Sequence, residues 1–144
     1  MKAEQKNDLF FLRLERGVEL VSSLETFASR HGIESAEVRA IGAITDFELG
    51  YYILSEKRYT RKKFEVIAEL ISGIGNLSIR EGKNFLHMHI SAGLPDFSVV
   101  GGHMFSAVVT ATIEAFVMPF GKRIERSFDE EIGLYLLDLP NEAL

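Results

Sequence analysis

The segment 76-NLSIREGKNFLHMHI-90 decides the fold, because it contains two strand-like runs joined by a turn. NLSIR and NFLHMHI are rich in branched and aromatic residues, which favour extended structure. The residues between them, Glu81-Gly82-Lys83, are typical of the tight turn in a β-hairpin. The segment therefore predicts two antiparallel strands.

Further strand-like segments lie on both sides of this hairpin. The first is LFFLRL, at residues 9–14. The others are AEVRAIGAI (36–44), FELGYYIL (47–54), KFEVIAELIS (63–72), VVTATIEAFVM (108–118) and LYLLDL (134–139). Sequential strands with short connections favour a mostly antiparallel sheet.

One segment, GVELVSSLETFASRHG at 17–32, predicts a helix. Leu20, Leu24, Phe27 and Ala28 recur at helical spacing on one face, and Gly32 supplies the left-handed stop. We therefore expect an α+β fold in which one long helix packs on a largely antiparallel sheet of about six to eight strands. The chain shows no linker or repeat, so we expect a single compact domain over residues 9–139, with tails at 1–8 and 140–144.

Several strands, such as AIGAI and IEAFVM, are apolar almost throughout. A strand of this kind is buried on both faces, and one helix cannot cover so large a sheet. The surplus apolar surface predicts contact with another copy of the chain, and hence a homo-oligomer.

The composition narrows the class of protein. No apolar run is long enough to span a membrane, no secretion signal is evident, and there is no cysteine for a disulfide or a thiolate site. We therefore expect a cytoplasmic protein without a membrane partner. The net charge of −5 argues against general nucleic-acid binding.

One local exception to this acidic charge is KRYTRKK, which spans Lys57 to Lys63. Its five basic residues are Lys57, Arg58, Arg61, Lys62 and Lys63. A solvated loop or an edge strand protected by lysines is the commoner interpretation. The alternative is a contact with DNA phosphates.

Three of the four histidines lie close together in the sequence. His87 and His89 are two residues apart in a strand, so both side chains leave the same face, while Leu86, Met88 and Ile90 take the other. A loop after Ala92 and the Gly101-Gly102 pair can return His103 beside them. Three neutral imidazoles suit Zn, and less selectively Ni, Cu or Fe, with a fourth position open. The alternative is a packed cluster that binds no ion. His31, at the predicted helix end, is interpreted as a structural residue.

Any catalysis has to rest on metal-activated water, because the chain has no nucleophile elbow, no Walker-type loop and no dinucleotide-binding loop. Three acids are candidate proton acceptors or partners of a ligating histidine. They are Glu69 and Glu114, within apolar strands, and Asp96, on a loop.

Over about residues 9–139, the chain resembles the plants-and-prokaryotes-conserved (PPC) domain family. The most specific resemblance lies in GKNFLHMHIS and VVGGHMFSAVVTATIEAF, and FFLRLERGVELVSSLETFASRHGI adds to it. The resemblance implies an α+β fold and a homotrimer. It also implies a metal at His87, His89 and His103, since some prokaryotic members carry one at these positions.

The same resemblance bears on partners. Stand-alone members are often described as predicted DNA-binding proteins, and plant members combine the domain with AT-hooks that contact DNA. This chain contains no R-G-R-P stretch, and KKFEVI at 62–67 matches the plant protein-interaction segment only in part. We therefore expect a trimeric, zinc-carrying binding or regulatory module, associated with DNA or with another protein. The alternatives are a purely structural metal that links subunits and a zinc-dependent enzyme.

Overall fold

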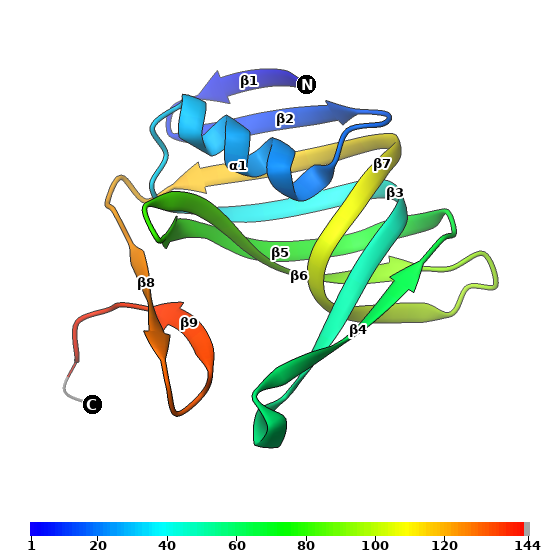
Figure 1. Ribbon diagram of the computed structural model, residues 1–144. Coiled ribbons are helices and arrows are strands. Elements are labelled where there is room, and N and C mark those ends of the chain that lie inside the picture. Colours follow the sequence, from blue (N-terminus) through cyan, green and yellow to red (C-terminus); the bar gives the residue numbers. More distant parts are fainter. Residues whose placement is uncertain (143–144) are drawn as a thin grey trace.

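The computed structural model describes residues 1–142 and consists mainly of β-strands (Figure 1). The elements in chain order are β1 (Lys2–Lys6), β2 (Leu9–Glu15), α1 (Leu20–Arg30), β3 (Ala36–Ile53), the 3₁₀ turn η1 (Leu54–Glu56), β4 (Arg58–Phe64), β5 (Ala68–Arg80), β6 (Lys83–Gly93), β7 (Val99–Pro119), β8 (Glu125–Asp129) and β9 (Leu134–Leu137).

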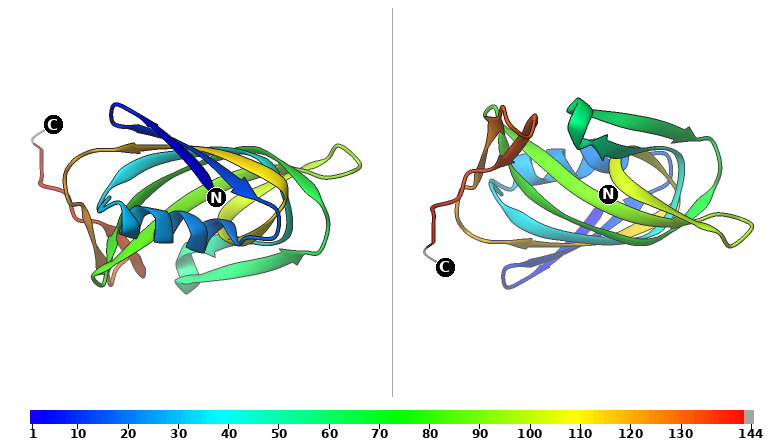
Figure 2. Two further views of the ribbon diagram at one scale, coloured as in Figure 1. Left: turned by 90° about the horizontal axis from the view of Figure 1, so that it is seen from above. Right: turned by 90° about the horizontal axis from the view of Figure 1, so that it is seen from below.

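The strands form one nine-stranded sheet in the order β1-β2-β7-β3-β5-β8-β9, with β4 added to β3. β6 pairs with both β5 and β7, so β7, β3, β5 and β6 close into a ring. The views from above and from below show the curled sheet that this pairing produces (Figure 2). The pairings are antiparallel except for a short parallel contact between β5 and β8, which makes the sheet mixed.

The expected α+β class with one long helix is wrong. The described residues contain a single α-helix of 11 residues against nine strands. The helical pattern is confined between Glu19, whose carboxylate accepts N–H bonds at the helix start, and Gly32, which has φ of +64°. Helix formation therefore stops after three turns. Most other residues pair as strands, including Lys2–Lys6 in the segment expected to be a tail.

Two strands are much longer than the sequence indicated. β3 has 18 residues and β7 has 21, and each bends so that it pairs in both halves of the ring. A register shift marks the bend in β3 at Ala40/Gly42. Only glycine fits there, because a Cβ on Gly42 would lie 2.1 Å from the Thr112 carbonyl oxygen.

The helix covers one face of the sheet (Figure 1). Leu20, Leu24, Phe27 and Ala28 are buried, as their spacing predicted, and belong to the main apolar core. His31 is the C-cap residue, and its ring lies 4.3 Å from the Phe27 ring, centroid to centroid. This position fits the structural role expected from the sequence.

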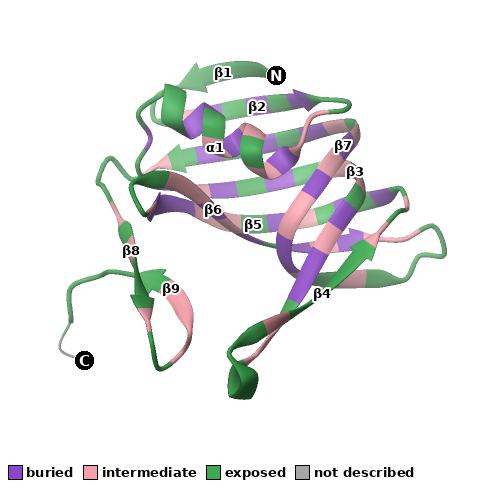
Figure 3. Ribbon diagram, viewed as in Figure 1, coloured by how far each residue is buried: buried purple, intermediate pink, exposed green. Residues whose placement is uncertain are grey.

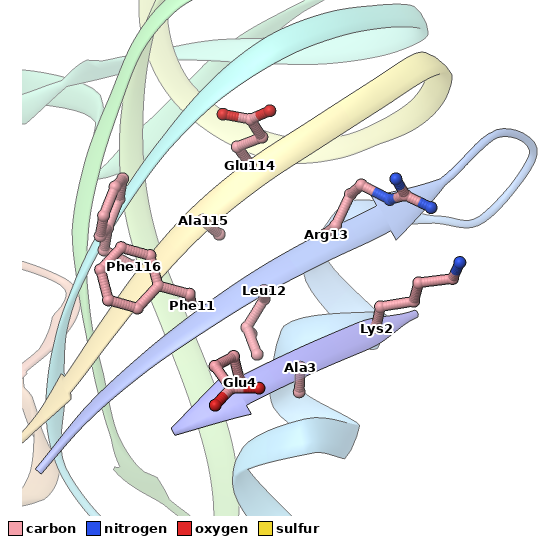
Figure 4. A pocket seen from close by; sticks show the side chains of 9 residues that line it. All are labelled: Lys2, Ala3, Glu4, Phe11, Leu12, Arg13, Glu114, Ala115 and Phe116. Carbon is pink, nitrogen blue, oxygen red and sulfur yellow. The ribbon is translucent and has the colours of Figure 1, made fainter. Parts of the chain in front are cut away.

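Buried and exposed residues alternate along the strands (Figure 3), and the face of the sheet away from the helix carries exposed apolar side chains. Phe11 on β2, Phe116 on β7, Ile41 on β3 and Ile74 on β5 are 39–60% exposed. The Phe11 and Phe116 rings touch at 4.8 Å between centroids (Figure 4). We call these four residues the open apolar face.

Candidate metal centre

The three histidines meet where β6 pairs with β7. The hairpin of β5 and β6 forms as predicted, with Glu81 and Gly82 at positive φ in its turn. His89 lies directly opposite His103 in the antiparallel register. One donor nitrogen from each of His87, His89 and His103 lies within 4.8 Å of the others.

The glycine pair before His103 brings the strands together. A Cβ on Gly101 would lie 2.8 Å from the Ile90 carbonyl oxygen, and one on Gly102 would lie 2.7 Å from that of Gly50. A larger residue would therefore push β7 away from β6 or from β3. Close backbone approach, rather than a sharp turn, explains why glycines precede His103.

The environment keeps two of the imidazoles neutral. Burial, with Arg126 and His89 nearby, lowers the pKa of His87 to about 4. Burial and the neighbouring histidines likewise lower the pKa of His103 to about 4. Neutral imidazole is the form that coordinates a metal, so no proton has to be displaced at pH 7.

The geometry fits an ion bound by nitrogen. The His87 and His89 Nε2 atoms are 3.2 Å apart, whereas tetrahedral Zn with bonds of about 2.0–2.1 Å separates two ligands by about 3.3 Å. Among residues 1–142, His103 Nδ1 is buried and has no hydrogen-bond partner, which is costly for a polar atom that binds nothing. His87, His89 and His103 could therefore hold a metal ion.

Arg126 of β8 lies against this cluster. Its Nε donates to Ser78 Oγ (2.8 Å), its Nη1 to the Tyr135 carbonyl (2.9 Å), and its Nη2 to Asn76 Oδ1 (2.9 Å). Nη2 also lies 3.4 Å from His87 Nδ1. An arginine can only donate, so this contact is a hydrogen bond only in the neutral tautomer that carries its proton on Nε2, whereas a metal on Nε2 would place the proton on Nδ1 and end that bond.

A cleft of about 450 Å³ opens beside His87 and His103. Its walls come from α1, β4, β5, β6, β7 and the β8–β9 hairpin. They include the aromatic residues Tyr59, Phe85, Phe105, Phe128 and Tyr135, the cations Arg61, Arg80 and Arg126, and the carboxylate of Glu25. Tyr52 Oη holds the loop of the β8–β9 hairpin, since it donates to the Ile132 carbonyl at 2.6 Å.

The three acids predicted as partners are not among the residues that line this cleft. Glu69 is exposed on β5. It lies five residues, or about 16 Å of strand, from Ile74, and Ile74 is the residue of β5 that pairs with His89. Glu114 is exposed on β7 opposite Arg13 (Figure 4). Asp96 accepts hydrogen bonds from Ser98 N and Oγ, which lower its pKa.

Glu25 is the acid that the structure places in the cleft. Its Oε1 accepts the Leu86 N–H at 2.9 Å. Leu86 lies on the part of β6 that pairs with β5 but does not pair with β7. Burial raises the pKa of its carboxyl group. Glu25, Arg80 and Arg126 were missed in the sequence because nothing in their spacing connects them to the histidines. Glu25 lies in the predicted helix and Arg80 in a predicted strand, whereas Arg126 lies in a polar segment, so charge did not single them out.

The basic segment forms β4, an edge strand, as one of the two interpretations expected. Much of its charge is paired locally. Arg58 donates to Glu56 at 2.6 Å, Arg61 lies 3.8 Å from Glu48, and Lys57 donates to the Glu130 carbonyl at 2.7 Å. Lys62 and Lys63 remain exposed.

The sequence profile of the Plants and Prokaryotes Conserved (PCC) domain matches residues 1–121. No functionally curated protein matches the chain. No helix within residues 1–142 has the length and apolar character needed to cross a membrane.

Several solved structures share the fold. A metal-containing protein from Archaeoglobus fulgidus is 40% identical, with a TM-score of 0.85 over 94% of this chain and 95% of that one. A candidate DNA-binding protein from Bacteroides thetaiotaomicron is 28% identical, with a TM-score of 0.91 over 95% and 96%. A plant- and prokaryote-conserved (PPC) protein from Pyrococcus horikoshii is 29% identical, with a TM-score of 0.86 over 98% and 96%.

Proposed function

The chain belongs to the Plants and Prokaryotes Conserved domain family, and from this premise we propose that it is a homotrimeric binding module that carries Zn at His87, His89 and His103. The convergence of three donor nitrogens from two strands carries the proposal. The 40% identical metal-containing relative adds support. A bound ion would supply Lewis acidity and an open coordination position for a ligand.

The open apolar face supports self-association. Ile74 is 60% exposed and pairs in register with His89, so this face reaches the metal centre. Exposed apolar side chains grouped on one face, here with Arg39 between Phe116 and Ile74 in the strand register, are typical of a subunit interface. A trimer would bury the face and bring a second chain close to His89.

Metal content tests the proposal directly. We expect tag-free wild-type protein to carry about one transition-metal ion per chain by plasma mass spectrometry, and His87→Ala and His103→Ala to lose it. His31→Ala is the matched control and should keep the ion. Wild-type protein without metal after Zn incubation and desalting would contradict the metal part.

Light scattering tests the assembly independently. We expect a mass about three times the 16.2 kDa of one chain. Ile74→Asp should shift the protein toward monomer, whereas Leu54→Asp, which removes an equally exposed side chain outside this face, should not. A wild-type monomer would refute the trimer.

A DNA-associated role is the second candidate, favoured by the relative described as a candidate DNA-binding protein. The local pairing of Lys57, Arg58 and Arg61 argues for a weak contact at most. A low-salt gel shift with duplex DNA, compared with a variant in which Lys62 and Lys63 are Gln, tests it. Equal migration with and without protein would remove this candidate.

A further inference from the structure

The cleft beside the histidines has an uncompensated positive charge, although the chain as a whole is acidic. Arg61, Arg80 and Arg126 line it, against one carboxylate, Glu25. Arg61 also has Glu48 at 3.8 Å. Neither Arg80 nor Arg126 is paired with a carboxylate in the part of the chain that the structure describes.

The two unpaired arginines differ in what holds them. The Arg126 guanidinium donates to three neutral acceptors, which fix its position but do not neutralise its charge. The Arg80 guanidinium carbon lies 4.2 Å from the Phe85 ring centroid and 5.2 Å from that of Tyr135. A guanidinium stacked on rings keeps its in-plane N–H groups free to meet an anion in bidentate geometry.

The walls around these charges are largely aromatic. Phe85 lies under both guanidinium groups, since the Arg126 carbon is 5.4 Å from its centroid. Tyr59 and Phe105 flank His103, with ring centroids 5.0 and 4.7 Å from its own. Apolar walls with a few convergent polar groups are typical of a small-molecule site.

We propose that this cleft binds a small organic oxyanion, with its carboxylate or phosphate group held by Arg80 and Arg126 and its apolar body on Phe85 and the neighbouring rings. The inference goes beyond the proposed metal module, because the arginines can hold an anion whether or not an ion occupies the histidines. Arg126 and the wall of Phe128 and Tyr135 lie beyond residues 1–121, the range that the family profile matches.

The test is isothermal titration of benzoate, acetate and inorganic phosphate into the full chain, both metal-loaded and after chelation with the chelator dialysed away. Benzoate combines the anionic group with a ring, and acetate carries a carboxylate alone. Phosphate tests whether the arginines bind a phosphate group as well as a carboxylate. We expect saturable binding in both preparations, with benzoate tighter than acetate. Metal content is measured on the same samples, so failure of the metal proposal is seen separately.

Variants identify the groups involved. Arg80→Gln should weaken binding of the anions at least about tenfold, because it removes a charged hydrogen-bond donor to the anion. Arg16→Gln, which removes an exposed charge outside the cleft, should change it less than about twofold, because exposed charges are screened. Phe85→Leu should weaken benzoate but leave phosphate unchanged. Near-ultraviolet circular dichroism checks that each variant is folded.

Three results would overturn the proposal. The first is no saturable binding of any of the three anions. The second is binding that is lost on chelation and unaffected by Arg80→Gln, which would make the anion a metal ligand only. The third is an equal loss in Arg80→Gln and Arg16→Gln, which would indicate a general charge effect.

Discussion

His87, His89 and His103 come from two strands and meet at one point. The five basic residues from Lys57 to Lys63 instead stay spread along the edge strand β4 and the residue just before it. Both groups are concentrations of one chemistry in the sequence. The histidines converge because alternate residues of β6 share a face and β7 pairs beside them. The basic residues alternate between faces, and Lys57, Arg58 and Arg61 find acidic or carbonyl partners nearby, while Lys62 and Lys63 stay exposed. A local concentration of one residue type in the sequence therefore indicates a site only where the strand geometry brings the side chains together.

The largest expected effect concerns the stability supplied by the metal. An ion at about a thousand times its dissociation constant stabilises the folded state by about 4 kcal/mol. We expect Zn to raise the melting temperature of wild-type protein and of a variant with all five basic residues changed to Gln. In His87→Gln it should have little effect. Differential scanning calorimetry measures the melting temperature with and without Zn. An equal rise in His87→Gln would show that the ion does not bind at the histidines.

The strand geometry can be tested without changing any histidine. Gly102→Ala places a Cβ 2.7 Å from the Gly50 carbonyl oxygen and should destabilise the fold by about 2–4 kcal/mol, with loss of metal. Gly121→Ala is the control, since it also has positive φ but no atom within 4 Å, and should cost about 1–2 kcal/mol. Urea denaturation measures both. Full metal content in Gly102→Ala would show that close strand approach is not required.

The stability of the chelated protein should also depend on pH. The pKa of His87 and His103 falls from 6.5 in the unfolded chain to about 4 in the folded one, so the unfolded chain binds more protons between these values. Stability should therefore be highest above pH 6.5 and fall as the pH drops toward 4. Urea titrations across this range measure the slope. A double His87→Gln/His103→Gln variant should give a flatter profile, and an identical slope would assign the effect elsewhere.

The smallest expected effect concerns the basic segment. Changing Lys62 and Lys63 to Gln should alter stability by less than about 0.5 kcal/mol, because exposed charges contribute little. Metal content should be unchanged. A loss of metal in this variant would mean that β4 supports the histidines through a contact that its exposed charges do not indicate.

The hairpin and the helix faces could be read from the sequence because they depend on local rules. Glu81 and Gly82 adopt the positive φ that a tight turn needs, and Leu86, Met88 and Ile90 are buried opposite the histidines. These features need only strand alternation and turn chemistry.

The long bent strands could not be read in the same way. The sequence suggested a break between Ile44 and Phe47, and Asp46 does have φ of +46°. Pairing with β7 carries β3 through this irregularity, so one strand continues where two were expected. Tertiary pairing overrode a local turn signal.

Arg126 was missed for a related reason. The segment ERSFD is polar and reads as a loop, yet it forms β8 through a parallel contact of only two residue pairs. A non-local pairing this short leaves no periodic pattern in the sequence. The structure alone brings this arginine to His87.

The short attachment of β8 has a consequence for how such a protein can diversify. The histidines lie on strands of the closed ring, whereas Arg126, Phe128 and Tyr135 lie on a hairpin joined to it by that two-pair contact and a few side-chain hydrogen bonds. Substitutions in the hairpin can alter the cleft with little cost to the ring. The histidine cluster and the wall that faces it can thus change independently, so that the shape and charge of the cleft can vary while the ring stays fixed.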